Sequence, residues 1–463
     1  MARGFLPHNP DQQLLLPPDM REWLPEEHLA SFISDVVEDL ELSSILREYE
    51  GEETRGRAGY HPKMMLKLLV YGYCVGRASS RKIERATYED VAFRVLACDQ
   101  HPDHDSIASF RKRHLQAIGS LFLQVLRICE KAGLVKLGHI AIDGTKMGAN
   151  ASKHKAMSYE RMEGAEKKLR EEIERLLAEA ERVDAEEDAQ FGKGKRGDEL
   201  PKELQRRESR LKKIGEAKAA LEAEAKAKAE AAAAEATQKN EERKKKEEET
   251  GKKKGGRPSV VPEVEAAKPD PKAQRNFTDP ESKIMPDGAN KGAFMQAYNA
   301  QIAVDAHAQI IVAVNLTQQT NDKRQLEPMA QQIVRNVERL ADTTSADAGY
   351  FSEQAIKAVE AMGTNLLVPP DRQKHSATDV IAPLESNPTA IARMRAKLHT
   401  AEARALYRMR KAIVEPVFGQ IKSARGIRRF LLRGFSNAGH EFSLIALTHN
   451  LLKLFRARTA LAA

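Results

Sequence analysis

The sequence feature that most constrains the fold is an apolar run that predicts a β-strand, because the strands with which it could pair lie far away along the chain. Residues 137–147 read LGHIAIDGTKM, a pattern that predicts a buried strand broken by Gly144 just after Asp143. The next β pattern begins only at Tyr298. Because a lone strand leaves its backbone N–H and C=O groups unpaired, the sheet must assemble across the long segment between these two places.

The second half of the chain predicts strands that first pair as a hairpin and then alternate with helices. The hairpin runs over 298–316 and turns at 305–308. The elements expected after it are a helix over 325–340, a strand over 343–347, a helix over 352–362 and a strand over 365–368. This order is typical of a mixed α/β sheet.

The N-terminal part predicts an all-helical domain over 27–134, after an irregular, Pro-rich segment at 1–26. Apolar residues from Leu29 to Leu40 recur at three- and four-residue steps, as they do on an amphipathic helix. Further helices are expected over 62–76, 81–96 and 106–132, the last with Asp105 as its N-cap.

Two of these helices are joined by a short turn that contains Gly76, an arrangement similar to a helix-turn-helix. The polar side of this region carries Arg81, Lys82 and Arg85, so we expect residues 27–134 to bind DNA. The alternative is a basic, solvated face on a helical bundle, which would show the same residues.

The charge of the chain is uneven. Lys and Arg total 75 against 67 Asp and Glu, and many acidic residues fall in one low-complexity block, which leaves basic stretches elsewhere. The three cysteines form no CxxC pair, which argues against a zinc site or a disulfide framework. No stretch approaches the ~20 apolar residues of a membrane-spanning helix. We therefore expect a soluble cytoplasmic protein that associates with the nucleoid when it binds DNA.

The insertion between the first strand and the hairpin has two parts. Residues 159–221 place apolar residues seven apart in two runs separated by a Gly-rich turn, which predicts an antiparallel helical hairpin with coiled-coil character. Residues 222–275 are rich in Ala, Glu and Lys and then in Gly and Pro. This composition predicts a low-complexity linker.

Three acidic residues stand in well-marked contexts. Asp143 follows the first apolar run, Asp347 ends a predicted strand, and Glu415 precedes a strongly basic segment. In a sheet whose first and fourth strands are neighbours, Asp143 and Asp347 would lie side by side, at the strand ends where ligand sites of open sheets collect. Hard cations such as Mg²⁺ take carboxylate oxygens together with substrate phosphates. The pattern therefore predicts a metal site that acts on a phosphodiester.

Glu415 is expected where a helix begins or kinks, because the following Pro416 disfavours helical geometry at the residue before it. Lys422 lies two helical turns later and faces the same way, which puts a phosphate-binding ammonium beside the carboxylate. The other acids near predicted turns are interpreted as turn or cap residues, namely Asp305, Asp322 and Asp342.

Short motifs spread over the chain are YHPKMMLKLLVYGY (60–73), SSRKIER (79–85), PDHDSIASFR (102–111), DGTK (143–146), TDPES (278–282), QAYNAQ (296–301), ADAGYF (346–351) and VEPVFGQIK (414–422). With these motifs the chain resembles bacterial insertion-sequence transposases of the DDE class. The resemblance implies an RNase H-like catalytic domain, a mixed sheet with helices, formed by residues 135–158 and 276–463. It also implies that Asp143, Asp347 and Glu415 are a metal-binding triad that holds two Mg²⁺ (or Mn²⁺) ions.

Basic residues around Glu415 are expected to bind DNA. Lys422 matches the lysine that contacts the DNA end in related transposases. Tyr407 and Arg410 stand near the places of a tyrosine and an arginine in that signature, although Lys411 occupies the usual place of the arginine. The segment that begins at Lys422 lacks acids and should bind phosphates with a steep salt dependence through Arg425, Arg428, Arg429 and Arg433.

We therefore expect a DNA transposase that cuts and rejoins the ends of its own insertion sequence. Its partners would be double-stranded DNA, as terminal inverted repeats and target, and a second copy of the chain in the paired-end complex. An RNase H-like nuclease that cleaves without strand transfer needs the same triad, so only an assay for joined products separates it. A non-catalytic DNA-binding protein derived from a transposase is a further alternative, against which the presence of all three acids argues.

Overall fold

The computed structural model describes residues 20–49, 59–191, 202–250, 257–288, 290, 292–371 and 389–462. The chain divides into two compact units. The first is formed by residues 1–148 and 298–463, and the second by residues 149–297. In the described residues, no helix is both long and apolar enough to span a bilayer.

The N-terminal part of the first unit is helical, as predicted. Its elements are η1 (Met20–Trp23), α1 (Leu29–Asp39), α2 (Ser43–Leu46), η2 (Arg47–Tyr49), α3 (Pro62–Cys74), α4 (Ser80–Glu89), α5 (Val91–Leu96) and α6 (His104–Lys131). The apolar stripe expected on α1 is buried, with Ile33 and Val37 fully enclosed. Pro62 occupies the first turn of α3, where its missing N–H costs no helical hydrogen bond.

Two local predictions in this region are wrong. The helix expected over 81–96 is split at Asp90, whose extended backbone ends α4 and whose carboxylate caps α5 by accepting from Ala92 N at 3.0 Å. The N-cap of α6 is Asp103, which accepts from Ser106 N at 2.8 Å, and Asp105 lies in the first turn instead. Both caps, Asp90 and Asp103, have the extended backbone that an N-cap residue requires.

The sheet is mixed, and all but one of its strands overlap strands that the sequence predicts. Its strands are β1 (His139–Gly148), β4 (Lys283–Pro286), β5 (Phe294–Asp305), β6 (Ile311–Thr317), β7 (Thr343–Ser345) and β8 (Asn365–Leu367). β4 was not expected, because the next β pattern was placed only at Tyr298, whereas β5 already begins at Phe294. The order is β4-β5-β1-β7-β8, with β6 paired to β5. β5 and β6 form the predicted antiparallel hairpin, whereas β1, β7 and β8 run parallel. The first and fourth predicted strands correspond to β1 and β7, and these two strands are neighbours, as expected.

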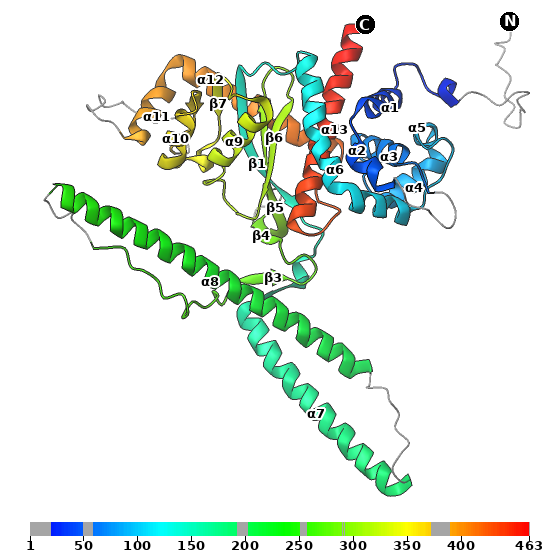
Figure 1. Cartoon of the computed structure of the whole chain (residues 1–463), viewed down its shortest axis with the longest axis vertical. Helices are drawn as coiled ribbons and strands as arrows, with labels where there is room; N and C mark the ends of the chain where they lie inside the picture. The colour runs from blue at the N-terminus through cyan, green and yellow to red at the C-terminus, as the bar shows by residue number, and fades with distance from the viewer. Residues whose placement is uncertain are drawn as a thin grey trace, which may run out of the picture. The chain divides into compact units, whose positions relative to one another are not determined.

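Helices pack on both faces of this sheet within the first unit. They are α9 (Leu326–Val337), η4 (Ala348–Tyr350), α10 (Glu353–Glu360), α11 (Ala390–His399), α12 (Ala401–Gly419), η5 (Gln420–Ala424) and α13 (Phe435–Ala462). In Figure 1 the sheet runs between α9 and α10 on one side and α6 and α13 on the other. α9 and α13 both contact β6, and α12 contacts β1.

The N-terminal helices and the sheet share one core, because α13 packs along α6 and α3. Glu441 on α13 is fully buried there and accepts from the Tyr73 hydroxyl of α3 at 2.8 Å. It also accepts from the backbone N–H groups of Leu431 and Leu432, at 3.0 Å each. Residues 27–134 therefore belong to the same compact unit as the sheet.

The second unit contains the insertion. Besides β4 and the first residues of β5, its elements are η3 (Lys153–Lys155), β2 (Ala156–Ser158), α7 (Tyr159–Phe191), α8 (Lys202–Thr250) and β3 (Gln274–Asn276). β2 pairs antiparallel with β3. α7 and α8 pack on each other, as the predicted hairpin requires (Figure 1). Their shared cluster contains the heptad residues Met162 and Leu169 with Ile214 and Leu221. The Gly-rich turn falls largely at 192–201, outside the described residues.

The linker predicted from residue 222 begins inside α8, which stays helical to Thr250. Ala, Glu and Lys are strong helix formers, and pairs four residues apart support the helix, such as Glu235 with Lys239 at 2.6 Å. Glu224 also accepts from Arg275 at 2.7 Å, within the same unit. The prediction of a linker is therefore wrong for residues 222–250, where the low-complexity sequence forms part of a long helix. The fold class is confirmed as an RNase H-like mixed sheet preceded by helices and interrupted by a helical insertion.

Candidate active site

Asp143 and Asp347 occupy equivalent positions on neighbouring parallel strands. The register pairs Ala141 of β1 with Ser345 of β7, and each acid follows two residues later. Because side chains on a strand repeat every second residue, Asp143 lies on the same face of β1 as Ala141. β1 continues to Gly148, so the break expected just after Asp143 does not occur. Asp347 follows the end of β7 by two residues and caps η4, accepting from Gly349 N at 2.9 Å.

The Asp143 carboxylate is held by two donors in a largely buried place. Its Oδ1 accepts from Gly144 N at 2.8 Å, and its Oδ2 lies 3.0 Å from Arg410 Nη1. Burial raises the pKa of Asp143 to about 6, although the Arg410 guanidinium acts in the opposite direction, and the nearby Asp347 charge adds to the rise. Two carboxylates that repel each other in a poorly solvated place favour the binding of a cation.

Of the two adjacent basic residues Arg410 and Lys411, Arg410 is the one that faces Asp143. Arg410 is only 7% exposed and its guanidinium lies 5.9 Å from the Tyr407 ring. Lys411 is exposed. Both Tyr407 and Arg410 therefore lie near Asp143. Their spacing to Glu415 departs from the usual signature, so the sequence had not decided between Arg410 and Lys411.

Glu415 lies on α12 between two residues that attach this helix to β1. Arg410 contacts Asp143 before it, and after it Lys422 donates to Thr145 Oγ1 at 2.6 Å and to Lys146 O at 2.7 Å. Val414 beside it is buried, whereas Glu415 is exposed.

The helix does not begin at Glu415, as the sequence suggested it could. α12 already runs from Ala401 and passes through Pro416 to Gly419. The irregularity comes later, as the wide turn η5. Packing of the helix on the sheet outweighs the local preference of the residue before proline.

The predicted triad is brought together in part. Asp143 and Asp347 are neighbours, and Glu415 stands on the adjacent helix. Among the residues that the structure describes, no three His, Cys, Asp or Glu side chains come close enough to hold a metal ion together. The donors are nonetheless of the kind that Mg²⁺ prefers, because all are carboxylate oxygens and two of them form a mutually repelling pair.

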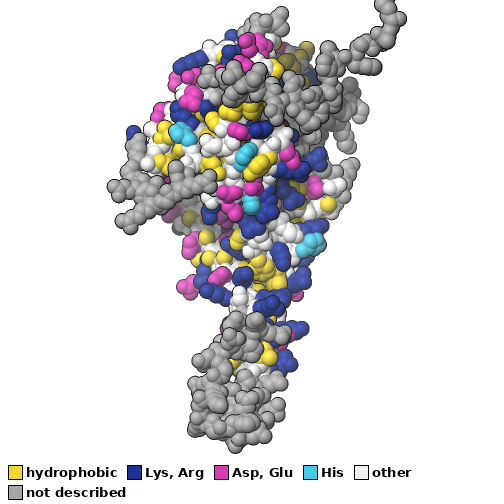
Figure 2. All heavy atoms as spheres, turned by 90° about the vertical axis from the view of Figure 1, so that its right-hand side faces the viewer, with side chains coloured by type: hydrophobic (Ala, Val, Ile, Leu, Met, Phe, Trp, Pro, Cys, Tyr) yellow, Lys and Arg dark blue, Asp and Glu magenta, His cyan; other side chains and the backbone are white. Residues whose placement is uncertain are grey.

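The predicted basic residues divide into exposed and buried groups. Arg428, Arg429 and Arg433 are exposed, as are Arg81, Lys82 and Arg85 on α4. On the face drawn in Figure 2, Lys and Arg side chains are interspersed with acidic and apolar ones.

Arg425 is buried and lies inside the first unit. It donates to Thr448 Oγ1 at 2.8 Å and to the Ile445 carbonyl, both on α13. Gly76 packs against its backbone so closely that a Cβ there would stand 2.4 Å from the Arg425 carbonyl oxygen. The buried position of Arg425 therefore indicates a structural role, and not the DNA contact that the sequence suggested.

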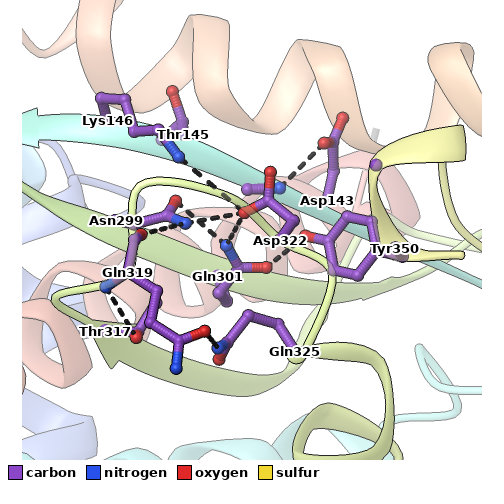
Figure 3. Close-up of polar contacts among 12 residues, drawn as sticks. Asp143, Thr145, Lys146, Asn299, Gln301, Thr317, Gln319, Asp322, Gln325 and Tyr350 are labelled. Atoms are coloured by element: carbon purple, nitrogen blue, oxygen red, sulfur yellow. Dashed lines mark hydrogen bonds and ion pairs between the residues drawn. The ribbon is translucent and has the colours of Figure 1, made fainter. Parts of the chain in front are cut away.

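A polar network beside Asp143 was not anticipated from the sequence (Figure 3). Asp322, interpreted as a turn residue, accepts from the amides of Asn299 and Gln301 at 2.7 Å each. Tyr350 donates to Gln301. One signal was available, since Asn299 and Gln301 interrupt an apolar strand pattern at a spacing of two, on one face. The interpretation of the other two acids agrees with their positions, as Asp305 caps a turn and Asp342 is exposed.

Comparison with protein families finds two matches. A model described as "Transposase domain (DUF772)" matches residues 18–113, and one described as "Transposase DDE domain" matches residues 263–451. The second match includes Asp347, Glu415 and Lys422, whereas Asp143 lies between the two. No curated protein and no solved structure matches the chain.

Proposed function

Because the chain belongs to the DDE transposases of insertion sequences, we propose that it cuts and rejoins DNA at the ends of such an element with Asp143, Asp347 and Glu415. The family makes it a DNA-acting transposase, and this class of enzymes generally uses divalent metal ions. The roles of the individual residues and the two-metal chemistry are our proposal.

The observation that carries the proposal is that Asp143 and Asp347 each lie two residues beyond Ala141 and Ser345, which are partners on the neighbouring parallel strands β1 and β7. Arg410 and Lys422 attach the segment that carries Glu415, the proposed third acid, to β1. Acids from two neighbouring strand segments and from an adjoining helix can surround a phosphodiester.

Asp143, Asp347 and Glu415 would hold the metal ions. Two divalent ions bound there would activate the attacking oxygen and stabilise the leaving one. Arg410 keeps Asp143 oriented and favours its ionised form. Lys422 holds the end of α12 on β1, which fixes the helix that carries Glu415.

The exposed Arg428, Arg429 and Arg433 would bind the DNA backbone near these acids. The basic face of α4, with Arg81, Lys82 and Arg85, would bind DNA as well. Joining two element ends calls for two active sites, so we propose a homodimer in the paired-end complex.

One experiment tests the proposed function. The full chain is incubated with Mg²⁺ and labelled DNA that carries the element's ends, and the products are resolved by size. Nicked ends together with joined products support the transposase. Cleavage without joined products would favour a nuclease, and binding without cleavage would favour a non-catalytic DNA-binding protein.

The Mg²⁺ requirement should depend on pH. Burial raises the pKa of Asp143 to about 6, so this carboxylate takes up a proton as the pH falls through that value and competes with the metal. Below pH 6 we expect the half-saturating Mg²⁺ concentration for cleavage to rise, by up to ~tenfold for each pH unit. Cleavage rates over a Mg²⁺ series at pH 5, 6 and 8 measure this. An equal Mg²⁺ requirement at pH 5 and pH 8 would contradict it.

Loss of the exposed arginines should flatten the salt dependence of DNA binding. In the variant R428Q/R429Q/R433Q, the slope of log affinity against log salt should fall by about 2–3, since each phosphate contact contributes about 0.9. A matched control, K226Q/K228Q/K244Q, removes three exposed charges from α8. An equal fall in both variants would show that net charge, and not this segment, determines the slope.

A further inference from the structure

Tyr350 joins the turn that carries Asp347 to a strand on the other side of Asp143. Tyr350 lies in η4, the one-turn helix that Asp347 caps, and its side chain is fully buried. Its hydroxyl donates to Oε1 of Gln301 on β5 (Figure 3). In the sheet, β1 lies between β5 and β7. The bond therefore crosses the strand that carries Asp143.

The crossing point is Gly144, the residue after Asp143. A Cβ on Gly144 would stand 2.3 Å from Gln301 Nε2 and 2.9 Å from Asp322 Oδ1, so only glycine lets these side chains approach the strand so closely. The N–H of the same Gly144 donates to Asp143 Oδ1 at 2.8 Å. Gln301 thus packs against the backbone that holds the first acid, and through Tyr350 it holds the turn of the second.

The orientation of the Gln301 amide is determined by its neighbours. Its Nε2 donates to Asp322 Oδ1 at 2.7 Å and to Asn299 Oδ1 at 3.0 Å. A carboxylate can only accept, so the NH₂ end must face Asp322 and the oxygen is left to accept from Tyr350. Asn299 donates to the same Asp322 oxygen at 2.7 Å, which keeps that carboxylate in place.

The amides of the network are buried, and its carboxylate has a cationic neighbour. Asn299 and Gln301 are fully buried, and Lys146 Nζ lies 3.8 Å from Asp322 Oδ1. Buried amides are costly unless they are hydrogen-bonded, and a satisfied polar network is rigid. Apolar side chains at the same places would serve packing alone, but they would not join the η4 turn to β5.

We propose that Gln301 and Tyr350 are positioning residues that set the separation of Asp143 and Asp347, with Asn299 and Asp322 holding Gln301 in the required orientation. The inference rests on the proposed function, in which those two acids hold divalent metal ions. Partners that orient metal ligands from the outside typically contribute about 10–100-fold to metal affinity or activity.

The test measures Mn²⁺ binding directly. The full-length Tyr350→Phe variant keeps the buried ring and loses only the hydroxyl. In calorimetric titration with Mn²⁺ alone, its Kd should rise about tenfold, and end cleavage should slow about tenfold or more, while affinity for end DNA stays unchanged. The matched control is Tyr73→Phe, which removes another buried hydroxyl that donates to a side-chain oxygen, that of Glu441. It should lower thermal stability without changing the Mn²⁺ Kd.

Two variants of Asp322 test the orienting role. Asp322→Ala removes the acceptor that orients Gln301 and should raise the Mn²⁺ Kd about tenfold, whereas Asp322→Asn keeps an acceptor oxygen and should stay near the wild-type Kd. A Tyr350→Phe protein with the wild-type Mn²⁺ Kd would overturn the inference. Equal Mn²⁺ binding by the wild type and by Asp143→Asn would instead overturn the proposed metal site itself.

Discussion

Asp143→Asn is expected to reduce cleavage of end DNA by ~100- to 1,000-fold, the scale on which removal of one preorganised electrostatic group acts in an active site. The amide keeps the shape of the carboxylate, but it removes the charge that a divalent ion needs. Asp347→Asn and Glu415→Gln should have losses of the same order. End-DNA binding should be largely retained, because the exposed arginines are untouched. Single-turnover cleavage and a binding titration measure the two quantities.

The matched control for these variants is Asp342→Asn. Asp342 directly precedes β7, at the opposite end of the strand from Asp347, and its side chain is 75% exposed. This variant should cleave like the wild type. Robust cleavage by any one of the three acid variants would remove that residue from the proposed triad, and the exposed Glu415 is the most demanding of the three tests.

Glu441→Ala is expected to lower the free energy of unfolding by about 3 kcal/mol or more, because it removes the buried acceptor of several donors. Glu441 accepts hydrogen bonds from the Tyr73 hydroxyl and from the N–H groups of Leu431 and Leu432. These donors come from α3 and from the segment between η5 and α13, so the loss falls where the N-terminal helices meet the rest of the first unit. Denaturant unfolding of the full chain, followed by circular dichroism, measures the change.

Tyr73→Phe provides the comparison for this variant. It removes one of the same hydrogen bonds and leaves the carboxylate with its backbone donors, so it should cost only about 1 kcal/mol. Equal losses in the two variants would show that Glu441 contributes to stability through Tyr73 alone.

The first two acids could be placed from the sequence because strand signals are local. The apolar run before Asp143 and the short run before Asp347 predict two strands that end in carboxylates. The order of alternating elements then favours a sheet in which these strands are neighbours, and the β1–β7 pair confirms it. The heptad spacing of the insertion predicted the packing of α7 on α8 for the same reason, since a period of seven is visible in the sequence.

The surroundings of the acids could not be predicted, because they depend on which side chains from distant segments meet. Arg410 and Lys411 are adjacent and both basic, and only the rotation of α12 on β1 decides that Arg410 reaches Asp143. Arg425 belongs to a basic cluster by sequence, yet packing of α13 encloses it. A side chain's charge is read from the sequence, whereas its exposure is set by the neighbouring helix.

By itself, then, the sequence determined the periodic features of this protein: most of its helices and strands, the mixed sheet, the helical insertion, and the acids that follow two apolar runs. Tertiary structure alone decided the contacts across strands and helices, which no periodicity encodes. Asp322 looks like a turn residue by its local sequence, and it becomes part of the network beside Asp143 only because β1, β5 and the loop before α9 come together. The physical reason is range, since backbone preferences act over a few residues and hydrogen bonds between side chains act across the fold.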